Sequence, residues 1–525
     1  MFLKILLLVI FFGVMVAVGL YCRRSATDVS GFVLGGRSVG PWLTAFAYGT
    51  SYFSAVIFVG YAGQFGWKYG IASTWVGLGN AFIGSLLAWS VLGRRTRIMT
   101  QHLGSATMPE FFGRRFCSNA LKIGASVITF LFLIPYTASL YNGLSRLFEM
   151  AFGMDYTICI VVMAILTGVY VIAGGYMATA INDFIQGIIM LFGIIAVIAA
   201  VIASKGGLIA ALDGLAAVTD ESVSATPGAF NSFFGPDPLN LLGVVLLTSL
   251  GTWGLPQMVQ KFYAIKSEDA VQKGTVISTF FAIVVAGGCY FLGGFGRLFS
   301  DRIEIAASGI PVGGYDAVIP TMLSGLPDIL IAIVVILVLS ASMSTLSSLV
   351  LASSSTITID FLKDNFVKDM DEKKQVRCIR AFVVVFIVLS AAIAVFQYRS
   401  SLSATSSNSA TFIAQLMGVS WGALAGAFLA PFLYGLYWKK TTKAACWVSF
   451  VFGSVLMVLN MLARSAFPTL LQSPINCGAF AMIAGLIIVP VVSLFTPRPD
   501  MKMVDESFAC YEKKVEVSQK RSLID

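Results

Sequence analysis

Long apolar runs separated by short polar gaps make up most of this chain. A run of about 18 or more apolar residues is long enough to cross the hydrocarbon core of a bilayer as a helix. The runs predict about thirteen such helices. Their centres lie near Val9, Ser51, Leu78, Phe130, Met163, Leu191, Leu246, Val284, Val335, Val385, Leu424, Val451 and Leu486. The pattern therefore predicts an all-α integral membrane protein.

Composition and charge support this class. Hydrophobic residues make up 57% of the 525 residues and charged residues only 12%, which is too apolar for a soluble core. The net charge of +9 does not indicate a nucleic-acid partner, because most Lys and Arg lie in alternate gaps between the apolar runs. One such gap contains Lys261, Lys266 and Lys273. Positive residues collect in cytoplasmic loops, so we expect a multi-pass protein of the cytoplasmic membrane with its N-terminus outside and its C-terminus inside.

Two polar segments lie outside the predicted helices. Residues 204–240 are rich in Gly, Ser, Thr, Asp and Pro and predict an external loop, with a short helix at 208–218. Residues 497–525 are charged and predict a cytoplasmic tail. The chain is thus expected to comprise a transmembrane domain at 1–496 and this tail.

Two of the apolar runs are interrupted by small residues or proline, at 49–60 and at 249–257. A broken helix leaves backbone groups unpaired, and at bilayer depth these are tolerated only where they line a cavity. The two interruptions therefore predict a transporter.

The rarity of reactive side chains argues against an enzyme. The chain has a single histidine, His102, in a basic loop, and its eight cysteines form no C-x-x-C pair. It also lacks the phosphate-binding G-x-x-x-x-G-K-[ST] string, which disfavours ATP as an energy source.

Several motifs carry a resemblance to a known family. They are GGRSVG at 35–40, GGYMATAINDFIQG at 174–187, GLPQMVQKFYAIKS at 254–267 and ASMSTLSSLVLASSSTITIDF at 341–361, together with the broken second helix. In this order they resemble the sodium:solute symporter family. The resemblance implies a 5+5 inverted-repeat core with broken second and seventh helices, repeats at about 40–203 and 238–433, and sodium as the co-transported ion.

The ion site follows from this resemblance and from the chemistry of sodium, which is bound by carbonyl and hydroxyl oxygens. Ser344 and Thr345 match the family's paired hydroxyl ligands, and the backbone carbonyls of Thr50, Phe53 and Ala341 would complete the shell. Ser54 is a supporting hydroxyl. The alternative for any membrane Ser or Thr is a bond to a carbonyl one turn back in its own helix.

Asp183 lies in an apolar run without a basic neighbour in sequence. A carboxylate within the bilayer is costly, so it is a functional candidate, and the resemblance places it on the cytoplasmic route of the ion. The alternative is that Asp183 or Asn182 caps the start of the sixth helix.

The candidate solute-binding residues carry no fixed charge, and Tyr136 on the fourth helix is a further wall residue. They are Ser51, Tyr52, Ser54, Tyr141, Thr252, Trp253 and Gln257. Against the sugar-carrying members, Thr252 and Ile57 remove a stacking face and an amide, which disfavours sugar. Tyr52 and Thr252 also differ from the pattern of the proline carriers.

Together these features predict sodium-coupled uptake of a small organic solute, a monocarboxylate or an amino-acid-like molecule. The alternatives are a proton-coupled carrier, a sugar or nucleobase carrier of the same fold, and a solute sensor. The tail of about 30 residues is too short to hold a signalling domain.

Overall fold

A computed structural model describes residues 2–220, 223–224, 226–305, 311, 314–363, 365–367, 370–403 and 412–512. Within these ranges the protein is built from helices, and its β-structure is limited to isolated bridges. Ten of the described helices are long and apolar enough to cross a membrane, or eleven when one bent pair is counted as a span. The bent pair is Pro238–Gly254 with Pro256–Ala264. The fold is therefore the expected all-α membrane architecture.

Each of the thirteen centres predicted from the sequence lies in a helical segment. Two of them fall in segments too short to count as spans by themselves: Ser51 in the 12-residue helix Pro41–Tyr52, and Met163 in the apolar stretch Tyr156–Val169. Both short segments continue into further helix, the first beyond a break and the second beyond a kink. This accounts for the difference between the predicted and observed span counts.

The α-helices of the first half are α1 (Phe2–Cys22), α2 (Val29–Leu34), α3 (Pro41–Tyr52), α4 (Ala62–Tyr69), α5 (Thr74–Ala81), α6 (Arg94–His102), α7 (Met108–Arg115), α8 (Asn119–Phe152), α9 (Tyr156–Ser204) and α10 (Leu208–Ala216). Those of the second half are α11 (Pro238–Gly254), α12 (Pro256–Ala264), α13 (Glu268–Ala282), α14 (Gly288–Gly293), α15 (Val318–Ser324), α16 (Asp328–Thr356), α17 (Glu372–Ser403), α18 (Phe412–Tyr437), α19 (Lys443–Leu462), α20 (Pro474–Phe495) and α21 (Met501–Phe508). The short helix α10 matches the one predicted at 208–218.

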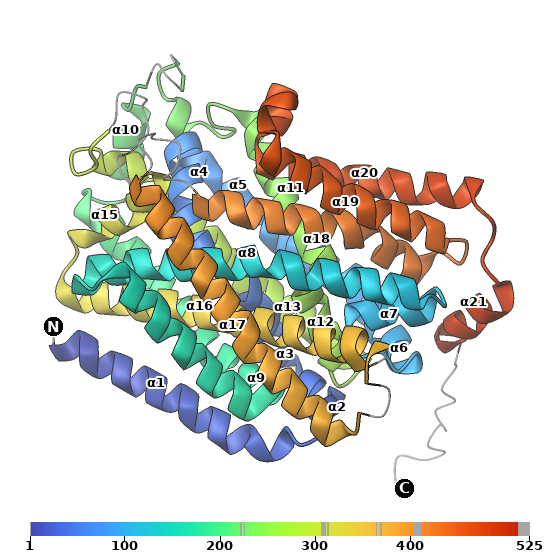
Figure 1. The fold of residues 1–525 in the computed structure, drawn as a ribbon. Coiled ribbons are helices and arrows are strands. Elements are labelled where there is room, and N and C mark those ends of the chain that lie inside the picture. The colour runs from blue at the N-terminus through green and yellow to red at the C-terminus, as the bar shows by residue number, and fades with distance from the viewer. Residues whose placement is uncertain are drawn as a thin grey trace, which may run out of the picture.

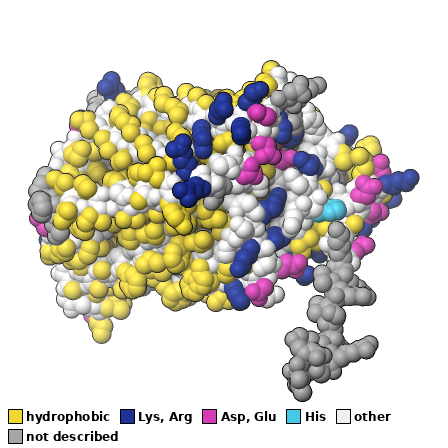
Figure 2. All heavy atoms as spheres, turned by 90° about the horizontal axis from the view of Figure 1, so that it is seen from below, with side chains coloured by type: hydrophobic (Ala, Val, Ile, Leu, Met, Phe, Trp, Pro, Cys, Tyr) yellow, Lys and Arg dark blue, Asp and Glu magenta, His cyan; other side chains and the backbone are white. Residues whose placement is uncertain are grey.

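The long helices run side by side, with α16 packed against α3, α8 and α9, while α18, α19 and α20 pack on one another and α18 also contacts α8 and α11. Figure 1 shows the start of α1 and α10 at one end of the bundle and α6, α7 and α21 at the other. Charged side chains gather toward one end of the face in Figure 2, and much of the remaining surface is apolar. An apolar band with a charged end is the surface that a membrane-spanning bundle presents.

Both predicted helix breaks are present. α3 ends at Tyr52, and Phe53 has an extended backbone (φ −84°, ψ 120°) before helix resumes in the π-helical segment Val56–Tyr61, η3. α11 and α12 are separated by Leu255 and meet at a bend of 46°. Pro256 at the start of α12 disfavours helical geometry at the residue before it, which explains the position of the second break.

A third irregularity lies in α9, where Gly175 has φ +58°. A side chain here would be strained by the backbone and would also meet the chain of α2, because an added Cβ would lie 2.8 Å from the carbonyl oxygen of Phe32. The glycine pair at the start of the motif 174–187 thus allows α9 to kink around α2.

Candidate ion and solute site

Five oxygen atoms from α3, its break and α16 converge in the centre of the bundle. The hydroxyl of Ser344 lies 3.0 Å from the carbonyl oxygen of Thr50 and 3.0 Å from that of Ala341. The hydroxyl of Thr345 lies 3.1 Å from the carbonyl oxygen of Thr50, 3.2 Å from that of Phe53 and 3.1 Å from that of Ala341. These are the five residues that the sequence predicted as ion ligands. The structure brings their oxygens together.

This cluster has more acceptors than hydrogens. The hydroxyls of Ser344 and Thr345 supply two hydrogens, whereas three carbonyl oxygens face them. The two hydrogens can satisfy only part of these contacts, so several lone pairs remain directed at a common centre. A buried set of uncharged oxygens of this kind suits a monovalent cation.

The break in α3 makes these carbonyls available. In an unbroken helix the carbonyl of Thr50 would accept from the N–H of residue 54, and that of Phe53 from the N–H of residue 57. Helix α16 also supports the chain after the break, since the hydroxyl of Ser342 accepts from the N–H of Ala55 at 3.0 Å. Ser342 was not among the predicted site residues. By contrast, the hydrogen bonds of Ser355 to described residues stay within its own helix, at the carbonyls of Leu351 and Ala352.

Asp183 lies inside α9, eight residues beyond the kink at Gly175, so it is not the cap of a helix start. Its side chain is fully buried and lies 3.7 Å from the ammonium of Lys261 on α12. The placement of Lys261 in a gap between helices is therefore wrong, because α12 continues the broken helix inside the bundle and all of its residues are buried. Asp183 does have a basic partner, although one remote in sequence.

Lys261 also connects this ion pair to the oxygen cluster. Its ammonium donates to the hydroxyl of Ser348 at 3.0 Å, and the hydroxyls of Ser348 and Ser51 are 2.9 Å apart. Ser51 follows Thr50 in α3, and Ser348 follows Ser344 by one turn of α16. A continuous polar path therefore runs from the ion pair to the cluster.

The predicted solute residues fall into two groups. Ser51, Ser54, Tyr141, Thr252 and Gln257 are buried, Trp253 is partly exposed, and the side chain of Tyr52 lies outside the described part. Thr252 donates to the carbonyl of Gly84 and the indole of Trp253 to that of Ile83, both at 3.0 Å. Both acceptors belong to the π-helical segment Phe82–Leu87 (η5). The two donor groups are therefore hydrogen-bonded within the protein.

The other group, which is joined by the wall residue Tyr136 and by Trp421, has buried polar atoms that reach no described residue with hydrogen-bond geometry. They are the hydroxyls of Ser54, Tyr136 and Tyr141, the indole N–H of Trp421, and both amide atoms of Gln257. The Tyr136 hydroxyl faces Ser54 and Trp421, and the rings of Tyr136 and Trp421 meet edge to face at 5.9 Å. Buried polar groups normally have partners, so unpaired ones beside the helix breaks are suited to hold a polar ligand.

Trp421 was missed in the sequence. It lies on α18, where Gly251 of α11 packs so closely that an added Cβ would lie 2.7 Å from the indole ring. A tryptophan among the small residues of the apolar run around Leu424 was the available signal.

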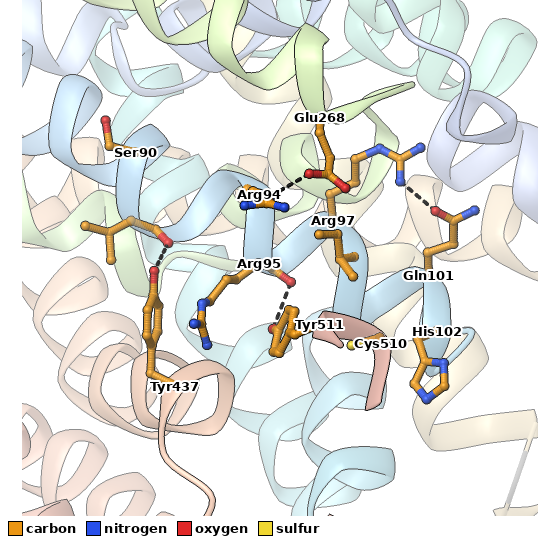
Figure 3. Close-up of a pocket in the computed structure, with 12 residues that line it drawn as sticks. Ser90, Arg94, Arg95, Arg97, Gln101, His102, Glu268, Tyr437, Cys510 and Tyr511 are labelled. Atoms are coloured by element: carbon orange, nitrogen blue, oxygen red, sulfur yellow. Dashed lines mark hydrogen bonds and ion pairs between the residues drawn. The ribbon is translucent and has the colours of Figure 1, made fainter. Parts of the chain in front are cut away.

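A separate pocket of about 670 Å³ lies at the end of the bundle that carries α6 and α21. Figure 3 shows Arg94 paired with Glu268, and Tyr511 donating to the backbone carbonyl of Arg95. His102 also lines it and contacts the carbonyl of Glu506 through Nε2 at 2.9 Å. This pocket is formed where the C-terminal segment docks on α6, and its lining residues include none from either helix break.

Comparison with known proteins gives one family. The profile of the sodium:solute symporter family matches residues 32–453. The osmoregulated proline transporter OpuE of Bacillus subtilis is 27% identical over 495 residues, covering 93% of this chain and 94% of the relative. The sodium/proline symporter of Staphylococcus aureus strain JH9 is 29% identical over 508 residues, with 94% and 93% coverage.

A solved structure of similar fold is the substrate-bound, outward-open state of a Na⁺-coupled sialic acid symporter. Its TM-score is 0.72 at 15% identity, with 95% of this chain and 99% of that chain covered. This likeness supports the inverted-repeat fold.

Proposed function

This chain belongs to the sodium:solute symporter family, and we propose that it takes up a small amino-acid-like solute across the cytoplasmic membrane together with sodium. The family consists of transporters, and sodium is their co-transported ion. The relatives named for proline transport cover nearly the whole chain, which favours an amino-acid-like solute over a simple monocarboxylate. The direction proposed is inward, with the N-terminus outside and the C-terminus in the cytoplasm.

The observation that carries the proposal is the cluster of five oxygens. A sodium ion bound by Thr50, Phe53, Ala341, Ser344 and Thr345 would tie α3 and its break to α16. Bound sodium thereby favours the conformation in which these elements meet. The ion drives uptake because its affinity differs between the outward-facing and inward-facing states.

The unpaired neutral groups near the helix breaks support a solute with both donors and acceptors. Ser54, Tyr136, Trp421 and Gln257 offer hydroxyl, indole and amide groups without a fixed charge. A zwitterion has no net charge to compensate, so such a surface can bind it without a buried counter-ion. A carboxylate group can in addition be held by free N–H groups at a half-helix start.

Uptake into proteoliposomes tests the proposal. Labelled proline, other small amino acids, pyruvate, acetate and glucose are offered with an inward gradient of sodium, and in parallel with choline in place of sodium. We expect accumulation of an amino acid only with sodium. Accumulation of acetate or pyruvate alone would replace the proposed solute class, and uptake that persists in choline would reject sodium coupling.

A further inference from the structure

Two buried opposite charges, Asp183 and Lys261, lie beside the proposed sodium site. We propose that the Lys261 ammonium acts as a built-in second cation at this site, so that the carrier moves one sodium ion per solute. This inference rests on the proposed function and specifies its ion stoichiometry.

The position of the ammonium supports this role. It donates to the Ser348 hydroxyl at 3.0 Å, and Ser348 in turn donates to the carbonyl of Ser344 at 3.1 Å. The Ser51 hydroxyl, 2.9 Å from that of Ser348, extends the path to the residue beside Thr50. The hydroxyl that accepts from the ammonium is therefore one helical turn from Ser344, and the charge is joined to the oxygen cluster through α16 and α3.

The carboxylate explains why a cation is required there. Asp183 is 0% exposed, and neither of its oxygens accepts a hydrogen bond from a described residue. Its contact with Lys261 is an ion pair at 3.7 Å, longer than a hydrogen bond. An unpaired carboxylate in such surroundings would be strongly unfavourable, so its charge is compensated by the ammonium.

The oxygens around the ammonium are those that a sodium ion could also use. The Asp183 carboxylate and the Ser348 hydroxyl both contact the ammonium, so its removal would leave a net negative charge at this place. A free sodium ion can supply the missing charge. Lys261→Met should therefore create a second sodium requirement, whereas the double variant Lys261→Met with Asp183→Asn removes both charges and should not.

The experiment counts sodium ions in purified protein and in proteoliposomes. Sodium activation of uptake gives a Hill coefficient, and ²²Na⁺ binding in detergent gives the number of ions bound per chain independently of transport. We expect about one for the wild type, about two for Lys261→Met and about one for the double variant. Lys261→Arg, which keeps the charge, and Lys439→Met, which removes an exposed lysine paired with Asp505 at 2.8 Å, should both stay near one.

The outcomes separate this inference from the proposed function. A wild type that binds two sodium ions overturns the built-in cation but leaves sodium-coupled uptake intact. The same holds if Lys261→Met folds and still binds one. If Lys261→Met fails to fold, the double variant decides. One sodium ion bound per chain of the double variant supports the proposed charge balance, and two sodium ions bound per chain refute it. Sodium-independent uptake by the wild type overturns the proposed function itself.

Discussion

Phe53 and Leu255 have nearly the same backbone conformation, φ −84° and ψ 120° at Phe53 against φ −83° and ψ 122° at Leu255. Each residue ends the first half of a broken helix, and the two breaks lie about 200 residues apart in the sequence. A shared extended residue at matching places is what two related repeats would produce. The repeat boundaries at about 40–203 and 238–433 remain a prediction.

Pro256→Ala tests the importance of the second break. Alanine restores a backbone N–H and removes the ring that keeps Leu255 out of helical geometry, so α11 and α12 can join into a straighter helix. We expect the maximal uptake rate to fall roughly tenfold, equivalent to about 1.4 kcal/mol. Pro238→Ala, at the start of α11 and away from the break, is the matched control, and an equal loss in both variants would contradict a specific role for the bend.

Replacing Ser344 and Thr345 together with alanine removes both side-chain oxygens of the proposed sodium site. The sodium concentration for half-maximal uptake should rise about tenfold or more, the effect of losing about 1.4 kcal/mol of binding energy. Ser355→Ala deletes a hydroxyl on the same helix that bonds only to its own backbone, and it should behave as wild type. Unchanged sodium dependence in the double variant would reject this site.

Tyr136→Phe removes one of the unpaired buried hydroxyls. If this hydroxyl binds the solute, the half-saturating solute concentration should rise roughly tenfold while the sodium dependence is little affected, because a hydrogen bond to a ligand is lost. The control is Tyr434→Phe, whose hydroxyl donates to the carbonyl of Leu486 at 2.9 Å in another part of the bundle. A gain in thermal stability with unaltered solute affinity would instead indicate a hydroxyl that is merely buried.

Asp316 should make folding stability depend on pH. It lies in the short helix Tyr315–Ala317 (η10), outside the spans, and burial raises its pKa to about 7, although Arg146 and the backbone N–H of Ile413 oppose the shift. From about pH 4 to 7 the folded protein holds a proton that the unfolded chain has released, so stability falls as pH rises through this window. Asp316→Asn should flatten the decline in melting temperature between about pH 4 and 7. If the variant and the wild type show the same decline, the pH dependence of stability comes from titratable groups other than Asp316.

Much of the oxygen cluster could be predicted because its determinants are local. The interruption at 49–60 and the hydroxyl pair in MSTLSS are each visible in a short stretch, and the resemblance supplied the relation between them. The structure then placed Ser344 and Thr345 against the carbonyls of Thr50 and Phe53.

The missed features depend on how distant segments fold together. Lys261 looks like a loop residue because it lies between two apolar runs, and its burial becomes apparent only when the half-helix α12 is placed inside the bundle. Trp421 likewise acquires its significance from Tyr136 and Gly251, which belong to other helices. The hydrogen bonds of Thr252 and Trp253 could not be predicted either, because their acceptors are backbone carbonyls of η5.

The ion pair between Asp183 and Lys261 has a consequence for energetics across the membrane. Because the two charges cancel, a carrier without sodium has no net charge at this depth, and the membrane potential exerts little force on its return. With one sodium bound, the complex carries a single positive charge, and each 100 mV contributes roughly 2.3 kcal/mol to its inward movement. Voltage would then accelerate the loaded half of the cycle, leaving the unloaded return to set the rate in strongly polarised cells.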